Sequence, residues 1–246
     1  VMYFKTDLIP NSQNPAIILV QSQPQEPNPF LYNAFFKKLI GKGILLAVLQ
    51  SRRILQPVNI ADKNISLSHR NDDIYDLISC ADFLVNQHWT HPDRMAVIGH
   101  EESCWTIGSV LNLKPSLFSC AIQHSPIMDP LALLMDNQDP LHLMRLQKWG
   151  DPNDKVEFDV LFQFSPYDQL EPKDYPPVLS ISDQMHERVP CWQALKWGNK
   201  MRLLNTSVSP VFIFTNLGNG PDNLTSEQIE SMQENFLYRY LGLSPE

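Results

Sequence analysis

The stretch Arg94-Met-Ala-Val-Ile-Gly-His-Glu-Glu-Ser-Cys-Trp-Thr-Ile-Gly-Ser-Val-Leu111 decides the fold. It predicts a short buried strand from Met95, a sharp turn at 99–103 and a helix that continues to about Leu113. Lys114-Pro115 ends that helix, because the residue before a proline is driven out of the helical region. A strand that enters a helix through so short a turn is typical of a parallel sheet covered by helices.

The rest of the chain repeats this alternation of strand and helix. Apolar runs bounded by turn residues predict strands, and apolar residues at helical spacing predict helices. Besides those of the opening stretch, the expected strands are 1–6, 16–20, 44–49, 119–124, 178–182 and 211–215. The expected helices are 30–40, a helix capped by Asp72 or Asp73, a Leu/Met-rich insertion at 131–147, 156–162, 191–204, and 226–241 with a Thr225-to-Gln228 capping box. The segment 51–68 shows no regular pattern.

These elements predict an α/β fold in which a mostly parallel sheet carries helices on both faces. A chain of 246 residues with 43% hydrophobic and 19% charged residues is long enough to bury a large core. We therefore expect a single domain that spans residues 1–246.

The net charge and the spacing of the cysteines limit which partners and which compartment we expect. A net charge of −8 and an isoelectric point near 5.3 argue against a nucleic-acid partner. Cys80, Cys104, Cys120 and Cys191 lack C-x-x-C spacing, which favours the buried thiols of an intracellular protein, cytoplasmic or organellar, over disulfides. No apolar run is long enough to predict a membrane span.

The turn at 99–103 has the outline of a nucleophile elbow. In an α/β-hydrolase this turn reads Gly-x-Ser-x-Gly, because the nucleophile sits on a strained backbone and the glycines let strand and helix approach. Here Glu101 occupies the centre and Ser103 replaces the second glycine. The turn therefore lacks the central hydroxyl.

Several longer motifs carry a more specific likeness. They are 110–118 (VLNLKPSLF), 149–154 (WGDPND), 164–168 (FSPYD) and 188–197 (RVPCWQALKW). On these motifs, nearly the whole chain resembles the catalytic domain of the prolyl oligopeptidase family of serine peptidases, and within it oligopeptidase B. The resemblance implies an α/β-hydrolase fold, with the family's N-terminal β-propeller absent from this chain.

The resemblance also indicates where the family's catalytic residues would fall. The nucleophilic serine falls on Glu101. The aspartate falls on His186, with Glu187 as the nearest acid. The histidine falls on Pro221 or a neighbour, and no histidine follows His186 in the sequence.

The oxyanion-hole tyrosine of the family falls on Gln23, or on Gln21 if the register shifts. Loss of one triad member typically lowers turnover about 10⁴–10⁶-fold, and what survives depends on an intact oxyanion hole. In this chain the triad positions and the oxyanion-hole position are all altered. The resemblance therefore implies an inactive peptidase that has no cofactor and is retained as a structural or protein-binding subunit of a larger assembly.

Two catalytic alternatives remain open. Glu101 could act as an elbow carboxylate nucleophile, as aspartate does in epoxide hydrolases and haloalkane dehalogenases, against a solvated or salt-bridged Glu101. Such a site needs a histidine base, and the loop after Thr215 has none. His186 could instead be a base paired with Ser182 or Ser103, against a solvated loop histidine.

The remaining candidates point to structure rather than chemistry. His88 and His91 are close in sequence but have no cysteine beside them, so no zinc site is expected. Cys104 begins a helix, where a lowered thiol pKa is one possibility and packing against the sheet the other. Core packing is also expected of the framework tryptophans Trp149, Trp192 and Trp197.

Overall fold

The computed structural model describes residues 1–22, 34–51, 63–216 and 223–243, and the side chains of these residues except 63–71. They form one seven-stranded sheet in the order β1-β3-β2-β4-β5-β6-β7. The strands are β1 (Met2–Tyr3), β2 (Ala16–Gln21), β3 (Leu45–Gln50), β4 (Met95–His100), β5 (Cys120–His124), β6 (Val178–Asp183) and β7 (Val211–Asn216). All neighbours run parallel except β1, which pairs antiparallel with β3.

The central strands are apolar because both of their faces are covered. Every residue of β2 is buried, as are Met95 to Gly99 of β4. A parallel sheet needs crossover helices, and these helices shield both faces from water. The predicted α/β architecture is confirmed.

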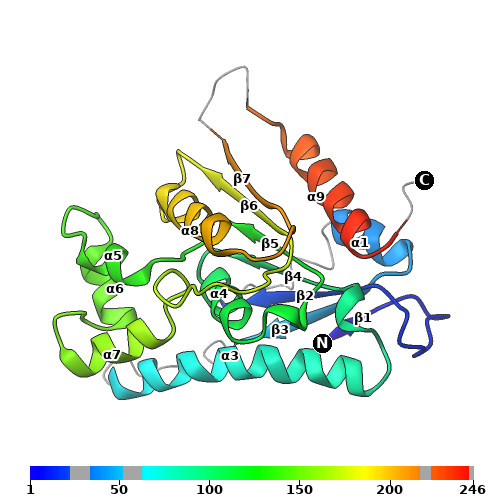
Figure 1. Ribbon diagram of the computed structural model, residues 1–246, viewed down its shortest axis with the longest axis horizontal. Coiled ribbons are helices and arrows are strands. Elements are labelled where there is room, and N and C mark those ends of the chain that lie inside the picture. The colour runs from blue at the N-terminus through cyan, green and yellow to red at the C-terminus, as the bar shows by residue number, and fades with distance from the viewer. Residues whose placement is uncertain (23–33, 52–62, 217–222, 244–246) are drawn as a thin grey trace.

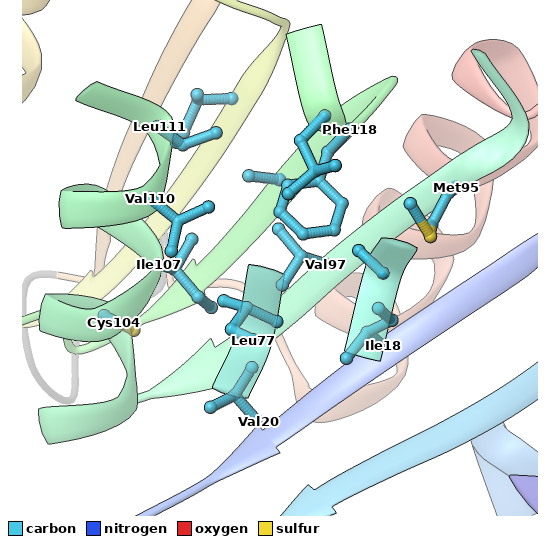
Figure 2. Close-up of a cluster of buried hydrophobic side chains, with 14 of the residues drawn as sticks. Ile18, Val20, Leu77, Met95, Val97, Cys104, Ile107, Val110, Leu111 and Phe118 are labelled. Carbon is cyan, nitrogen blue, oxygen red and sulfur yellow. The ribbon is translucent and has the colours of Figure 1, made fainter. Parts of the chain in front are cut away.

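The helices cover the sheet in two layers (Figure 1). One face carries α3 (Lys63–Asn86), α4 (Glu102–Leu113) and α8 (Trp192–Leu204), and the other carries α1 (Ala34–Gly41) and α9 (Ser226–Tyr240). Figure 2 shows the first layer, in which Ile107 and Val110 of α4 and Leu77 of α3 pack against Val97 of β4. The apolar residues that recur at helical spacing on α3 face the sheet, since Ile74, Leu77, Ala81 and Leu84 are at most 1% exposed.

The start of α3 differs from the prediction. The helix begins at Lys63, so Asp72 and Asp73 lie inside it and cap nothing. Its first turns are rich in serine, asparagine and charge and carry no apolar stripe, which is why the sequence pattern missed them. They extend an established helix, which costs far less than nucleating a new one. Asp73 is buried and accepts a hydrogen bond from Ser51 Oγ at 2.6 Å.

The insertion after β5 forms two helices instead of one. They are α5 (Pro130–Met135) and α6 (His142–Trp149). Between them Asp139 accepts a hydrogen bond from the backbone N–H of Leu141, and Pro140 cannot continue a helix. The break between the two helices is therefore caused by residues of the turn itself.

The other elements follow the prediction closely. Lys155–Gln163 is α7, capped by the side chain of Asp154, and the capping box of Thr225 and Gln228 at the start of α9 is present. Two 3₁₀ turns, Pro92–Arg94 and Pro115–Leu117, precede β4 and β5. Of the helix expected at 30–40, residues 30–33 lie outside the described part. No helix of the described residues is both long and apolar enough to cross a bilayer.

Candidate functional site

The turn between β4 and α4 forms the candidate site. Glu101 lies between the two elements with φ 48° and ψ −111°, a conformation that is strained for any residue with a Cβ. A Cβ on Gly99 would lie 2.5 Å from Ile107 Cδ1 and 2.8 Å from Ser103 Oγ, so glycine is needed there. The strand, turn and helix predicted for this stretch are confirmed.

The hydroxyl of Ser103 stabilises the turn itself. Ser103 is buried, and its Oγ accepts a hydrogen bond from His100 N at 2.7 Å and donates to His100 O at 2.8 Å. The hydroxyl closes the turn on its own backbone and does not pair with His186.

The carboxylate of Glu101 faces two nitrogen groups from the loop after β6. His186 Nε2 lies 3.6 Å from Oε1, and Arg188 Nη2 lies 3.4 Å from Oε2. The Glu101 side chain is 21% exposed, so it lies in a partly screened position. This corrects the expectation that His186 is a solvated loop side chain, and Glu101 is salt-bridged rather than merely solvated.

Backbone hydrogen bonds fix the proton of His186. Its Nδ1 accepts from Arg188 N at 3.3 Å and from Val189 N at 3.0 Å. A nitrogen that accepts carries no proton, so the neutral ring bears its hydrogen on Nε2, the atom that faces Glu101. His186 is therefore presented to Glu101 as a donor.

The α5–α6 insertion supports this arrangement from the side. Arg145, which is buried, donates through Nε to Asp139 at 2.6 Å and through Nη2 to the carbonyl of Arg188. Lys148 pairs with Glu102, whose side chain is buried. Sequence reasoning missed Arg145 and Lys148, because no local pattern connects α6 with the loop after β6.

The other predicted positions are only partly described. Gln21 ends β2, is 8% exposed, and its Oε1 lies 3.5 Å from Gln50 Nε2. Gln23 and Pro221 lie outside the described residues. Glu187 is exposed beside His186. Ser182, the other suggested partner of His186, instead contacts Thr215 Oγ1 at 3.1 Å.

Two further histidines lie beside the turn. His100 and His124 stack with ring centroids 4.4 Å apart, and His124 Nε2 lies 2.9 Å from Gln233 Oε1 on α9. Burial lowers the pKa of His124 to about 4, although the hydrogen bond to Gln233 acts in the opposite direction. His124 is therefore neutral at pH 7.

The cysteines and tryptophans belong mainly to the framework. All four thiols are free, with Cys104 and Cys120 buried and Cys80 and Cys191 partly exposed. Burial raises the pKa of the Cys104 thiol, so the suggestion of a lowered pKa at the helix start is wrong and the packing interpretation is confirmed. The tryptophans of the framework motifs all lie in the core or against it: Trp149, Trp192 and Trp197.

No group of three or more His, Cys, Asp or Glu side chains in the described part of the chain is placed to hold a metal ion. His88 contacts Ser12 Oγ at 3.2 Å, and His91 caps the 3₁₀ turn at Pro92. Chemically, the site offers a carboxylate held by an imidazole N–H and a guanidinium at the carboxyl end of β4.

Comparison with known proteins agrees with the fold. The model of the family described as "Prolyl oligopeptidase family" matches residues 62–242. This chain belongs to that family. The α/β-hydrolase fold inferred from the turn and the framework motifs is thereby confirmed.

The similar proteins are longer than this chain. Protease 2 of Moraxella lacunata is 27% identical over 182 residues, which are 74% of this chain and 26% of that protein. Dipeptidyl aminopeptidase BI of Pseudoxanthomonas mexicana is 26% identical over 215 residues, covering 87% and 29%. Oligopeptidase B from Leishmania major superposes with a TM-score of 0.83 at 23% identity, covering 98% of this chain and 34% of that one. The chain thus spans between a quarter and about a third of these relatives.

Proposed function

We propose that this chain is a catalytically inactive member of the prolyl oligopeptidase family that serves as a structural or protein-binding subunit of a larger assembly. In this proposal Glu101, His186, Pro221 and Gln23 stand at the positions of the nucleophile, the acid, the base and the oxyanion donor. Residues 1–246 then form one domain of the catalytic type.

One observation carries the proposal. The residue on the strained turn is a carboxylate, and it is ion-paired with Arg188 and faces the N–H of His186. A serine peptidase needs at this point a hydroxyl and an adjacent base that removes its proton. The side chain of Glu101 has no hydroxyl to activate, and His186 presents a donor rather than a lone pair.

A second observation supports the proposal. The hydroxyl nearest in sequence, that of Ser103, is bonded at both ends to the backbone of His100. Its removal from the turn would cost those bonds, so it is a poor substitute nucleophile.

Labelling by a serine-reactive fluorophosphonate tests the loss of activity. We expect neither the natural chain nor the Glu101→Ser variant to be labelled, because restoring the hydroxyl restores neither base nor oxyanion donor. An active oligopeptidase B is the positive control. Labelling of the natural chain, or cleavage of Arg- or Lys-containing peptides at rates typical of an enzyme, would disprove the proposal.

Affinity isolation under gentle conditions, followed by mass spectrometry, tests the assembly. We expect a stoichiometric set of protein partners. Recovery of the protein alone would contradict a subunit role.

A hydrolase that acts through Glu101 is the second candidate, and the imidazole 3.6 Å from the carboxylate favours it. The carboxylate would open the C–O bond of an epoxide or displace a halide from carbon to form an ester on Glu101, and a base would then activate water to hydrolyse that ester and release the alcohol. The tautomer of His186 argues against that base, because its free lone pair is already taken by two backbone N–H groups. An ester trapped on Glu101 and absent from Glu101→Gln would support this candidate.

A further inference from the structure

The sheet face that carries α1 and α9 bears a groove that is separate from the turn at Glu101. It has a volume of about 750 Å³ and lies along β7 and α9. Its walls include Phe212 and Phe214 of β7, and Met232 and Phe236 of α9. Phe212 is 48% exposed, an unusual state for a phenylalanine next to a core.

The strand beside this groove is the free edge of the sheet. No described strand pairs with β7 on its outer side. The register of the β6–β7 ladder pairs Ser180 with Ile213 and Ser182 with Thr215, and Val178 N donates to Pro210 O. In a parallel ladder, every second residue of a strand directs its N–H and C=O groups towards the neighbouring strand. Residues 211, 213 and 215 therefore direct theirs away from β6, towards the outer side of the sheet.

Two of these three positions have no backbone partner on the outer side among the described residues. Arg202 Nε donates to the carbonyl of Val211 at 2.8 Å and closes the first position. For Ile213 and Thr215, no outward backbone hydrogen bond occurs among the described residues. β7 also contains neither proline nor lysine, the residues that commonly block an exposed edge.

The charge at the groove selects the partner. Arg202 and Arg239 line it, and neither pairs with a carboxylate among the described side chains. Arg239 lies over the ring of Tyr240. Two arginines without a carboxylate partner among the described side chains are notable in a chain with a net charge of −8, and they favour an acidic ligand.

We propose that β7 and this groove bind an extended peptide segment of another protein by strand addition. The segment pairs its backbone with Ile213 and Thr215, places apolar side chains in the aromatic groove, and carries an Asp or Glu that meets Arg239, since Arg202 already donates to Val211 and Asn199. The inference rests on the protein-binding role proposed above and names the surface and the chemistry of the partner. Strand addition of this kind takes affinity from the main chain and specificity from alternate side chains.

The test selects twelve-residue peptides from a random phage-displayed library on the purified full chain. We expect the selected peptides to alternate apolar residues with at least one acid. Fluorescence anisotropy of the synthetic peptides then measures affinity. N-methylation of successive peptide nitrogens should abolish binding at every second residue and leave the residues between unaffected, because only one edge of an added strand pairs with β7.

Charge reversal completes the design. Arg239→Glu should weaken binding at least about tenfold. Lys155→Glu on α7, outside the groove, is the matched control and should leave affinity unchanged. Failure to select peptides, an N-methylation pattern without alternation, or equal binding by Arg239→Glu would each overturn the inference. Light scattering provides a further test. If this chain forms a dimer that the peptides dissociate, a second copy of the chain is the natural occupant of the groove and the inference is overturned.

The outcomes separate this inference from the proposed function. If the chain hydrolyses Arg-containing peptides but its peptide binding shows alternating N-methyl sensitivity, the proposed inactivity is wrong and the proposed binding surface at β7 is supported. If the chain is not labelled by fluorophosphonate and selects no peptide, the proposed inactivity is supported and the proposed binding surface is wrong.

Discussion

Replacing Glu101 by glycine and by alanine measures the strain stored in the turn. A residue held at φ 48° and ψ −111° costs about 1–3 kcal/mol. Glycine removes that strain but loses about 0.5–1 kcal/mol through its freer unfolded chain. Both variants lose the same ion pairs, which are partly exposed and worth about 0–1 kcal/mol each. We therefore expect Glu101→Gly to be about 1 kcal/mol more stable than Glu101→Ala.

Urea unfolding followed by tryptophan fluorescence measures the difference, provided that the m-value is the same for both variants. Glu230, which is exposed within α9, supplies a control with the opposite sign. There Glu230→Gly should be about 1 kcal/mol less stable than Glu230→Ala, as in any helix interior. If glycine is no more stable than alanine at position 101, the turn stores no strain and the reasoning fails.

Three further predictions concern packing, pH and capping. Gly198→Ala places a Cβ 2.6 Å from Ile213 Cδ1 and should cost about 1–3 kcal/mol in urea unfolding, whereas Gly41→Ala meets nothing within 4 Å and should cost nothing. His124 has its pKa lowered to about 4, so below about pH 6.5 the unfolded chain binds the extra proton and stability falls by up to about 1.4 kcal/mol per pH unit. His124→Gln should reduce that slope between pH 6.5 and 4 without abolishing it, because burial also lowers the pKa of the stacked His100, to about 3, and an unchanged slope would contradict the assignment. Thr225→Ala should lower the thermal unfolding midpoint by losing about 1 kcal/mol of helix capping, and a serine at the same position should restore it.

Local patterns predicted most of the fold. The apolar runs of β2 and β4, the capping box at Thr225 and the turn at Glu101 each depend on residues close together in the chain. The start of α3 was missed because its polar first turns carry no apolar stripe. The break between α5 and α6 was missed although Asp139 and Pro140 mark it, since the leucines and methionines on either side suggested one helix.

The candidate site was only half predictable. The turn singles out Glu101, because the conformation of a tight strand-to-helix connection is a local property. The approach of His186 and Arg188 depends on how the loop after β6 folds, and that loop is held by Arg145 from a third segment. Contacts between segments far apart in the chain leave no periodic signal in the sequence.

The joining of β2 to α9 in one apolar cluster constrains how this protein is made. Phe236, Leu237 and Leu241 pack in the same cluster as Ile17 and Leu19. At a synthesis rate of about 5–20 residues per second, the early strand waits on the order of ten seconds or more before its final cover leaves the ribosome. During that time its apolar residues are a substrate for chaperones. A premature stop codon before α9 would yield a chain in which α1 alone covers part of that sheet face, and we expect such a chain to be degraded rather than used as a shorter subunit.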